Sequence, residues 1–482
     1  MPLYERAQTA FLLLEKDWEN LCQRYLPVFP EDSLWKFSRQ INPDDPEQGW
    51  KIHISATILT ATKILEKVAP FLCGNGVLFK APTSLQEVKK INCGLFYGFS
   101  QVGKIITVYP GNADIAVSIA QTLHGLTFRF RSPTVPYDVP FQQPGCVYYR
   151  YGSFKTLAIV NPDGSHILAV RDPTGTLVPD LRQPGYSVPN WVVDPFPQHR
   201  QTSMPVPVAT PLKTTFRAYD ALFQRGKGGV YRALDLSVAP ARLCVIKEGR
   251  RRGETDLDGR DGYWRVKHEE NILRVLHQAG VKVPEVYASF EVEGHYYLAM
   301  ELITGQNLQS LLTKAKKIPI AEALRYGIQV AKLLERIHSD GWVWRDCKPL
   351  NLIVTKRKTL RPIDFEGACR IDLPDPMPWG TTGYVPPEWI KGSGEGSRKS
   401  EDLYALGATL YQLLTGRIPD VKNPPIPLGT LRRKVPSIVR KIISELLNTD
   451  PRSRPDAYIV VRALKSVIQK QSIGQIVAAS LK

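Results

Sequence analysis

Residues in one stretch of the second half of the chain could together transfer a phosphoryl group. Asp346 is a carboxylate that could accept a hydroxyl proton, Lys348 is a cation for the phosphate in transfer, and Asn351 offers a side-chain oxygen to a metal ion. Asp364 follows as a second metal-binding carboxylate. This order of residue types predicts phosphoryl transfer assisted by a divalent cation.

A glycine-rich segment and two ionisable residues precede this stretch. Gly226, Gly228 and Gly229 lie beside a strand-like run, where backbone amides could approach phosphate oxygens closely. Lys247 ends the next strand-like run, and Glu269 lies on the apolar face of a helical pattern. A buried carboxylate needs a cationic partner, so we expect Glu269 to pair with Lys247. The glycine-rich turn by itself is a weak signal.

Taken together, these motifs resemble the protein-kinase signature over residues 216–470. The resemblance implies that Asp346 is the catalytic base and that Asn351 and Asp364 bind Mg²⁺. It also implies that Lys247 holds the α- and β-phosphates of ATP. The other residues that it assigns to the nucleotide are Glu269, which orients the lysine, and the adenine-binding hinge Met300, Glu301 and Leu302.

The resemblance extends to the residues after Asp364. Thr381 matches a threonine that is typical of Ser/Thr kinases rather than Tyr kinases. Glu388 and Arg454 are expected to form the family's structural ion pair, and Asp402 is expected to brace the catalytic loop. The implied substrate is therefore a Ser or Thr hydroxyl of a peptide or protein.

The segment between Gly367 and Trp379 contains no Ser, Thr or Tyr. It has no residue whose phosphorylation could provide a partner for Arg345 of the catalytic loop. Asp372 or Asp375 could supply a fixed carboxylate instead. The sequence thus predicts a kinase that is competent without phosphorylation of this segment.

Two positions depart from the kinase pattern. The glycine-rich loop lacks the third family glycine at its usual offset, where Tyr231 or a two-residue shortening takes its place. Glu366 replaces the glycine after Asp-Phe, and a side chain there resists a positive φ. Every chemically required group is nevertheless present, so we expect an active kinase; a pseudokinase scaffold is the weaker alternative.

The first half of the chain contains a second set of candidates. Lys51 and His53 alternate in a strand-like run, which places a base and an acid side by side on one face. A strand with two solvated polar residues is the alternative interpretation. Lys80, Lys104 and Arg150 each adjoin another strand-like segment, and their convergence would suit a dianionic phosphate.

These motifs are also recognisable. The Lys-x-His pattern at Lys51 resembles that of bacterial phosphothreonine lyases. The segments Gly49–His53, Gly103–Thr107 and Val147–Gly152 resemble the amino-terminal domain of class III lanthionine synthetases, and the kinase half agrees. The resemblance implies that phosphorylated Ser or Thr then loses phosphate to give dehydroalanine or dehydrobutyrine. Lys51 would remove the α-proton and His53 would protonate the leaving phosphate.

Only about a dozen residues follow Lys470, too few for the cyclase domain of that family. We therefore expect a lanthipeptide-type dehydratase whose cyclase, if any, is a separate protein. The main alternative is a regulatory Ser/Thr kinase whose first domain only binds peptide.

The elements that must position these residues form an α+β fold in each half. Prolines cluster between Asp172 and Pro211, which favours a domain boundary there. We predict an α+β lyase-like domain over 1–200, a Pro-rich linker over 201–215, a bilobal kinase-like domain over 216–470 and a tail over 471–482. The segments expected to be regular are a helix over 10–25, strands over 51–55, 104–109, 147–151 and 158–160, and helices over 321–338 and 403–414.

Composition limits the remaining classes. The chain has 482 residues, and 63 Lys and Arg against 46 Asp and Glu give a net charge of +17, which favours an acidic partner. A nucleic-acid motif is missing, so the expected partner is a peptide rather than nucleic acid. Seven scattered cysteines without metal spacing and the lack of a long apolar run predict a cytoplasmic protein without a membrane span.

Overall fold

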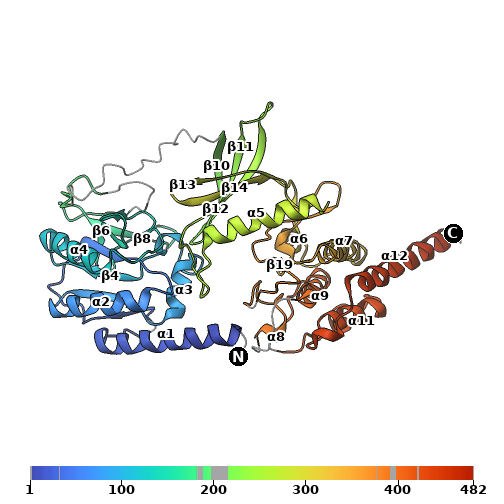
Figure 1. The fold of residues 1–482 in the computed structure, drawn as a ribbon, viewed down its shortest axis with the longest axis horizontal. Helices are drawn as coiled ribbons and strands as arrows, with labels where there is room; N and C mark the ends of the chain where they lie inside the picture. The colour runs from blue at the N-terminus through green and yellow to red at the C-terminus, as the bar shows by residue number, and fades with distance from the viewer. Residues whose placement is uncertain are drawn as a thin grey trace. The chain divides into compact units, whose positions relative to one another are not determined.

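The computed structural model describes residues 3–480 except 32, 181, 183–187, 197–214, 376, 391–397 and 421–422. Helices and strands are mixed along the whole chain (Figure 1), as the sequence predicts. The chain forms two compact units, one of Thr9–Trp264 with Phe290–Tyr297 and one of Met1–Gln8, Arg265–Ser289 and Leu298–Lys482. Nearly all of the predicted linker at 201–215 lies outside the described residues.

An antiparallel sheet organises the amino-terminal domain. Its strands, in the spatial order β1-β3-β4-β2-β6-β5, are β1 (Trp35–Phe37), β2 (Gln48–Ile54), β3 (Leu78–Pro82), β4 (Ile106–Tyr109), β5 (Val139–Pro140) and β6 (Val147–Ser153). The register places Lys51 opposite Arg150, and places Thr107 of β4 between His53 and Lys80. The strands therefore bring the predicted cations onto neighbouring positions.

Helices bury the opposite face of this sheet. They are α1 (Leu3–Tyr25), α2 (Ala61–Gly74) and α4 (Ala113–Thr127), while α3 (Leu85–Cys93) contacts β3 and η1 (Phe99–Gln101). Ile52 and Ile54 belong to the hydrophobic core with residues of α1, α2 and α4, so the alternation predicted for β2 is confirmed. Burial of this apolar face is the main stabilising contribution to the domain. A small antiparallel sheet of β7 (Ala158–Val160), β8 (His166–Arg171) and β9 (Leu177–Pro179) follows.

One predicted strand begins later than expected. The sequence predicts a strand from Lys104, but β4 begins at Ile106. Gly103 adopts a φ of 76°, and the Lys104 amide donates to the Gln101 carbonyl at 3.0 Å. The chain is thus still turning after the short helix η1 (Phe99–Gln101) when it reaches Lys104.

The kinase-like part begins with strands and continues with helices, as predicted. Its five-stranded sheet has the order β10-β11-β12-β14-β13, and α5 (Gly262–Gln278) follows the third strand along the chain. The strands are β10 (Phe216–Arg225), β11 (Gly228–Asp235), β12 (Arg242–Gly249), β13 (Val286–Val292) and β14 (His295–Glu301).

The helical lobe is built on α7 (Ile320–Ser339) and the almost entirely buried α9 (Lys399–Thr415), which contain the two helices predicted there. The other helices are α6 (Leu308–Ala315), α8 (Pro387–Ile390), α10 (Leu428–Leu431), α11 (Ser437–Leu446) and α12 (Ala457–Ser480). The short elements between them are β15 (Gln306–Asn307), β16 (Trp342–Val343), η3 (Pro349–Asn351), β17 (Leu352–Val354), β18 (Leu360–Pro362), β19 (Cys369–Arg370) and η4 (Pro451–Ser453).

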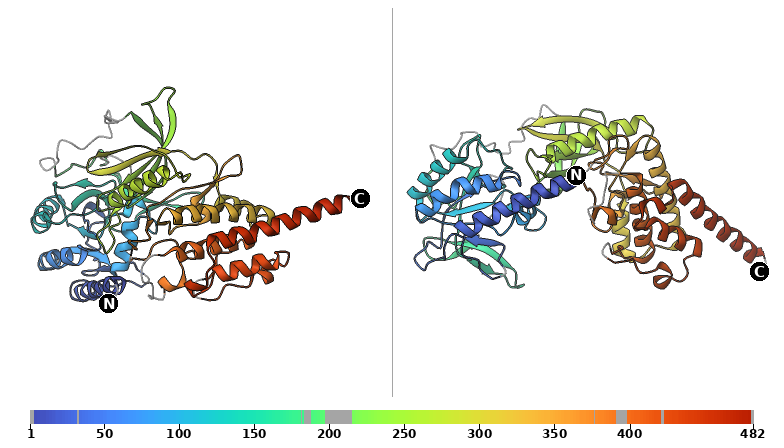
Figure 2. Two further views of the ribbon diagram at one scale, coloured as in Figure 1. Left: turned by 45° about the vertical axis from the view of Figure 1, so that its right-hand side comes forward. Right: turned by 60° about the horizontal axis from the view of Figure 1, so that its bottom comes forward.

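The last helix packs on α7 and then extends beyond it, as both views in Figure 2 show. It continues to Ser480, past Lys470 where the sequence predicts the tail to begin. Among the described residues, no helix combines the length and the apolar character that crossing a membrane requires.

Candidate active sites

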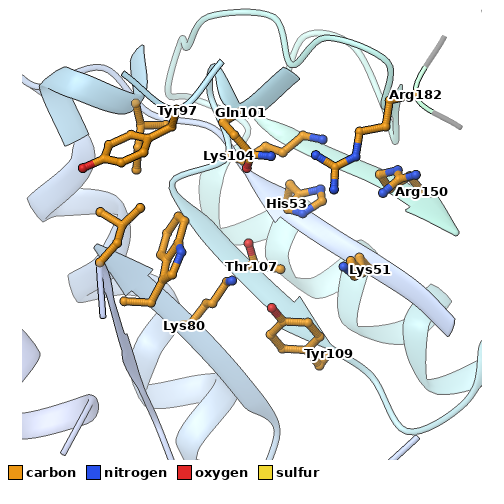
Figure 3. A pocket seen from close by; sticks show the side chains of 13 residues that line it. Lys51, His53, Lys80, Tyr97, Gln101, Lys104, Thr107, Tyr109, Arg150 and Arg182 are labelled. Atoms are coloured by element: carbon orange, nitrogen blue, oxygen red, sulfur yellow. The ribbon is translucent and has the colours of Figure 1, made fainter. Parts of the chain in front are cut away.

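The polar face of the first sheet forms a cavity of about 370 Å³. Figure 3 shows its side chains, which come from β1, β2, β3, β4 and β6, from α3 and η1, and from connecting segments. The cavity is lined by Lys51, His53 and the three other cations predicted from the sequence, Lys80, Lys104 and Arg150. The predicted convergence of these residues is therefore present, and the interpretation as solvated strand residues does not fit their burial.

A buried carboxylate that the sequence analysis missed organises one wall of this cavity. Asp138, directly before β5, lies 2.5 Å from Nδ1 of His53 and 2.8 Å from Nζ of Lys104, and 3.9 Å from Nε of Arg150. Burial alone would raise the pKa of Asp138, but Lys104 and His53 hold it well below its usual range. Asp138 is therefore ionised, and it orients His53.

His53 is uncharged in this arrangement. Burial, together with nearby Lys104 and Lys51, lowers the pKa of His53 to about 3, although Asp138 opposes the shift. A neutral ring that donates its Nδ1 proton to Asp138 carries a lone pair on Nε2. His53 must therefore gain a proton before it can act as an acid.

Two lysines of the cavity have no carboxylate within ion-pair distance among the described residues. Burial, with Arg150 and Lys80, lowers the pKa of Lys51 well below its usual value. Burial and nearby Arg182 lower the pKa of Lys80 to about 8. The Lys80 ammonium lies 4.4 Å from the centre of the Trp35 ring. Both lysines can therefore lose a proton far more easily than a solvated lysine.

The two arginines of the cavity differ in their partners. Arg150 donates to both carboxylate oxygens of Asp180 and lies near Asp138, so its charge is largely compensated. Arg182 was not identified from the sequence, because it follows β9 in the Pro-rich segment and belongs to no motif. Within the described residues its guanidinium has only a 3.4 Å contact with the Ser100 hydroxyl, and burial lowers its pKa. Arg182 thus offers the less compensated guanidinium to an anion.

The second candidate site surrounds Asp346, and its predicted residues are in contact. Oδ2 of Asp346 accepts hydrogen bonds from Nζ of Lys348 at 2.6 Å and from Nδ2 of Asn351 at 2.8 Å. The Thr381 hydroxyl donates to Oδ1 at 3.1 Å and accepts from Lys348 at 2.6 Å. Burial raises the pKa of Asp346, and the nearby Asp364 carboxylate adds to this while Lys348 opposes it. Asp346 is a buried, oriented carboxylate next to a second one.

Hydrogen bonds from the helical lobe hold this loop. Asp402 accepts the backbone amides of Trp344 at 2.8 Å and Arg345 at 2.7 Å, as the bracing role predicts. Arg345 has a φ of 70° and Asp364 a φ of 69°, a region that non-glycine residues rarely adopt. Such strain is common at functional sites, where the surroundings enforce it. Glu388 and Arg454 form two hydrogen bonds of 2.7 Å, the expected ion pair.

The donor atoms beside Asp346 fit Mg²⁺. Asn351 donates its amide nitrogen to Asp346, so its amide oxygen is directed elsewhere and can bind a cation. Asp364 provides a carboxylate close enough to affect the pKa of Asp346. Mg²⁺ is commonly held by one or two protein oxygens, with phosphate and water completing its octahedron.

One glycine of the predicted phosphate loop is required by the packing of the backbone. Gly228 has a φ of 153°, and a Cβ there would lie 1.8 Å from the Glu248 carbonyl oxygen, so β11 and β12 require glycine. Lys247 lies on β12 opposite Val230. In the predicted hinge, β14 ends at Glu301, whose carboxylate pairs with Arg361 at 2.7 Å. The Lys247–Glu269 pair and the nucleotide contacts stay predictions.

Comparison with known proteins identifies both halves. Residues 29–205 match the family model of the RamC N-terminal domain, and residues 226–464 match that of the protein kinase domain. The chain is 29% identical over 377 residues to a probable SapB synthase of Streptomyces coelicolor, which covers 75% of this chain and 40% of that protein. It is 26% identical over 282 residues to the serine/threonine-protein kinase PknA of Mycobacterium tuberculosis, covering 53% and 63% respectively.

Proposed function

We propose that this chain, which joins a RamC N-terminal domain to a protein kinase domain, phosphorylates Ser or Thr of a peptide and then eliminates the phosphate. The observation that carries the second step is the cavity of the first domain, where Lys51, Lys80 and Arg182 lack acidic partners among the described residues. Such a cavity suits a dianionic phosphate. We also propose a cytoplasmic location.

In the first step, Asp346 orients the acceptor hydroxyl and takes its proton. Lys348 and Thr381 each donate a hydrogen bond to the Asp346 carboxylate and so fix its orientation. Lys348 would also contact the phosphate in transfer. Asn351 and Asp364 would hold Mg²⁺, and Lys247 would contact the phosphates of ATP. With both bound, the nucleotide supplies the phosphoryl group and the metal neutralises its charge.

In the second step, a lysine removes the Cα proton of the phosphorylated residue. The electron pair of the C–H bond forms the Cα=Cβ double bond, the Cβ–O bond breaks, and phosphate leaves. His53 protonates the leaving oxygen. The pKa of His53 is low in the cavity without an anion. A bound phosphate dianion would raise it, because an adjacent negative charge favours the imidazolium. Binding of the substrate therefore charges the acid.

Two lysines could act as the base. Lys51 is the choice suggested by the Lys-x-His motif, and burial with nearby Arg150 and Lys80 lowers its pKa, which favours the neutral amine that a base requires. Lys80, with a pKa of about 8, is partly neutral at physiological pH. A catalytic pKa near the working pH is the most effective compromise. That criterion favours Lys80, whereas the Lys-x-His motif on β2 favours Lys51. We keep Lys51 as the proposed base, with Lys80 as its competitor.

The pH dependence of elimination separates the two lysines. If Lys80 is the base, kcat/KM for a phosphopeptide should be level below about pH 8 and fall above it, because Lys80 must lose a proton while His53, neutral in the free enzyme, must gain one. If Lys51 is the base, the profile should not change in Lys80→Ala, because the Lys80 proton is then not transferred. The measurement is phosphate release between about pH 6.5 and about pH 9.5, above the phosphate pKa of about 6.

Arg182 is expected to contribute to phosphate binding. Arg182→Ala should raise the KM for a phosphopeptide and weaken competitive inhibition by inorganic phosphate about tenfold or more, the scale of a lost charge-assisted hydrogen bond. Phosphorylation of the unmodified peptide should not change. Arg171→Ala, which removes an exposed arginine paired with Glu47, is the matched control. Unchanged inhibition by phosphate in Arg182→Ala would remove this residue from the site.

The proposed function is tested by intact-mass analysis of a Ser- or Thr-containing peptide incubated with the enzyme, ATP and Mg²⁺. Loss of one water per modified residue supports coupled phosphorylation and elimination. Accumulation of phosphopeptide with the wild-type chain favours the alternative, a kinase whose first domain only binds its substrate. The neutral state of His53 favours this alternative, because an uncharged imidazole with its Nδ1 proton held by Asp138 cannot protonate the leaving phosphate.

A further inference from the structure

Arg345, next to the proposed catalytic base, is completely buried and bonded on all sides. Its Nη1 donates to Asp375 at 2.9 Å, its Nε donates to Glu401 at 3.2 Å, and its Nη2 donates to the Met377 carbonyl. Its side chain has no exposed surface. In kinases regulated through this segment, a phosphate typically occupies the place of such a carboxylate.

The structure decides between the two carboxylates that could pair with Arg345. Asp375 is 15% exposed, and its other oxygen accepts the Met377 amide at 3.0 Å, which fixes the side chain in place. Asp372 is 66% exposed and pairs with Arg370 at 2.7 Å. Of these two aspartates, Asp375 is therefore the one that is built into the protein interior as a partner of Arg345.

The carboxyl groups of Glu401 and Asp375 compensate the buried charge of Arg345. Burial opposes the charge of Arg345, but Glu401 and Asp375 together raise the pKa of the guanidinium. Burial raises the pKa of Glu401 to about 7, against the effect of Arg345. One permanent cation thus faces Asp375 and a second carboxyl that is partly protonated at neutral pH. A buried guanidinium without these partners would be strongly unfavourable.

Helix α5 holds the same segment at its two ends. His268 lies 2.8 Å from the Ala368 carbonyl, and the Arg265 guanidinium lies over the Trp379 ring at 5.3 Å. Glu269 accepts the Phe365 amide at 2.9 Å. These helix residues have spacings that place them on one face of α5. The segment is therefore anchored at its beginning, in its middle through Asp375, and at its end.

We propose that Asp375 acts as a built-in substitute for a phosphorylated residue, so that the kinase domain is permanently competent. The Asp375–Arg345 pair holds the segment Gly367–Trp379 in the arrangement that places Thr381 on Asp346. Asp375 is a positioning residue, because it touches no reacting atom. This inference rests on the proposed kinase activity and adds that neither a kinase nor a phosphatase switches it.

The test uses the full chain with three variants. Asp375→Ala should lower the kcat of peptide phosphorylation about tenfold or more, because the segment that positions the acceptor loses its anchor. Asp375→Glu, which retains the carboxylate, should recover part of the loss. Asp372→Ala, the matched control at the exposed aspartate, should keep wild-type kcat. Wild-type protein treated with phosphatase, and shown by mass to be unphosphorylated, should retain its activity.

Hydrogen exchange gives a readout that does not depend on activity. Amides between Gly367 and Trp379 should exchange faster in Asp375→Ala than in the wild type, while those of α7 and α9 stay protected if the variant is folded. Full activity and unchanged exchange in Asp375→Ala, or loss of wild-type activity after phosphatase treatment, would overturn the proposal. A wild-type chain that phosphorylates no peptide would refute the proposed function instead. In that case hydrogen exchange would still test whether the Asp375–Arg345 pair holds the segment. If Asp375→Ala does not fold, Asp375→Asn replaces it in both measurements.

Discussion

Asp346→Asn is expected to abolish both phosphorylation and dehydration of a peptide while leaving elimination from a supplied phosphopeptide at the wild-type rate. Hydroxide is a far poorer leaving group than phosphate, so phosphoryl transfer must come first. Loss of one essential proton-transfer group costs about 10²–10⁴ in rate. Asparagine retains the shape of the side chain and one oxygen, which can accept from either Lys348 or Thr381. Intact-mass analysis of both peptides measures the two steps separately.

The matched control is Asp340→Asn, a partly exposed aspartate directly after α7 that pairs with Arg336. It should phosphorylate and dehydrate the peptide normally. Dehydrated product from Asp346→Asn at a wild-type rate would show that the base lies elsewhere. Loss of elimination from a supplied phosphopeptide in the same variant would mean that the two steps share one site.

His53→Ala is expected to convert the enzyme into one that stops at the phosphopeptide. Removal of the acid should slow elimination about 10²–10⁴-fold without slowing phosphorylation. The product should show a gain of one phosphate mass where the wild type shows loss of one water. Lys51→Ala should behave in the same way if Lys51 is the base, and Lys80→Ala should do so if Lys80 is.

The controls for these variants lie on the surface of the same domain. His166→Ala on β8 and Lys63→Ala on α2 remove exposed side chains of the same types. Both should dehydrate the peptide at the wild-type rate. If Lys51→Ala still dehydrates the peptide while Lys80→Ala does not, the role of base moves to Lys80. If His53→Ala dehydrates normally, the leaving phosphate takes its proton from another source.

The local features of both sites could be predicted from the sequence. Alternation along β2 has a period of two, so the side on which Lys51 and His53 project follows from the pattern itself. The kinase motifs are likewise local, because the residues around Asp346 lie within one loop and its short 3₁₀ helix. Helices α7 and α9 were predicted because their apolar periodicity extends over several turns.

Other members of the sites became visible only in the tertiary structure. Asp138 lies 85 positions from His53 along the chain, and Arg182 follows a short edge strand; neither belongs to a periodic pattern or a motif. The choice of Asp375 over Asp372 depends on which side chain the fold buries against Arg345. The partners of Arg345 also include Glu401, which the sequence analysis did not consider.

The sequence by itself therefore determined which reactive groups this protein has and which face of a strand or loop carries them, since these properties depend on residue type and short-range geometry. Only the tertiary structure decided their protonation and their partners. The lowered pKa values of Lys51, Lys80 and His53 arise chiefly from burial, and burial depends on the packing of segments far apart in the chain. A lysine on a solvent-exposed strand could have the same local sequence pattern, but without burial its pKa would not be lowered and it would stay charged.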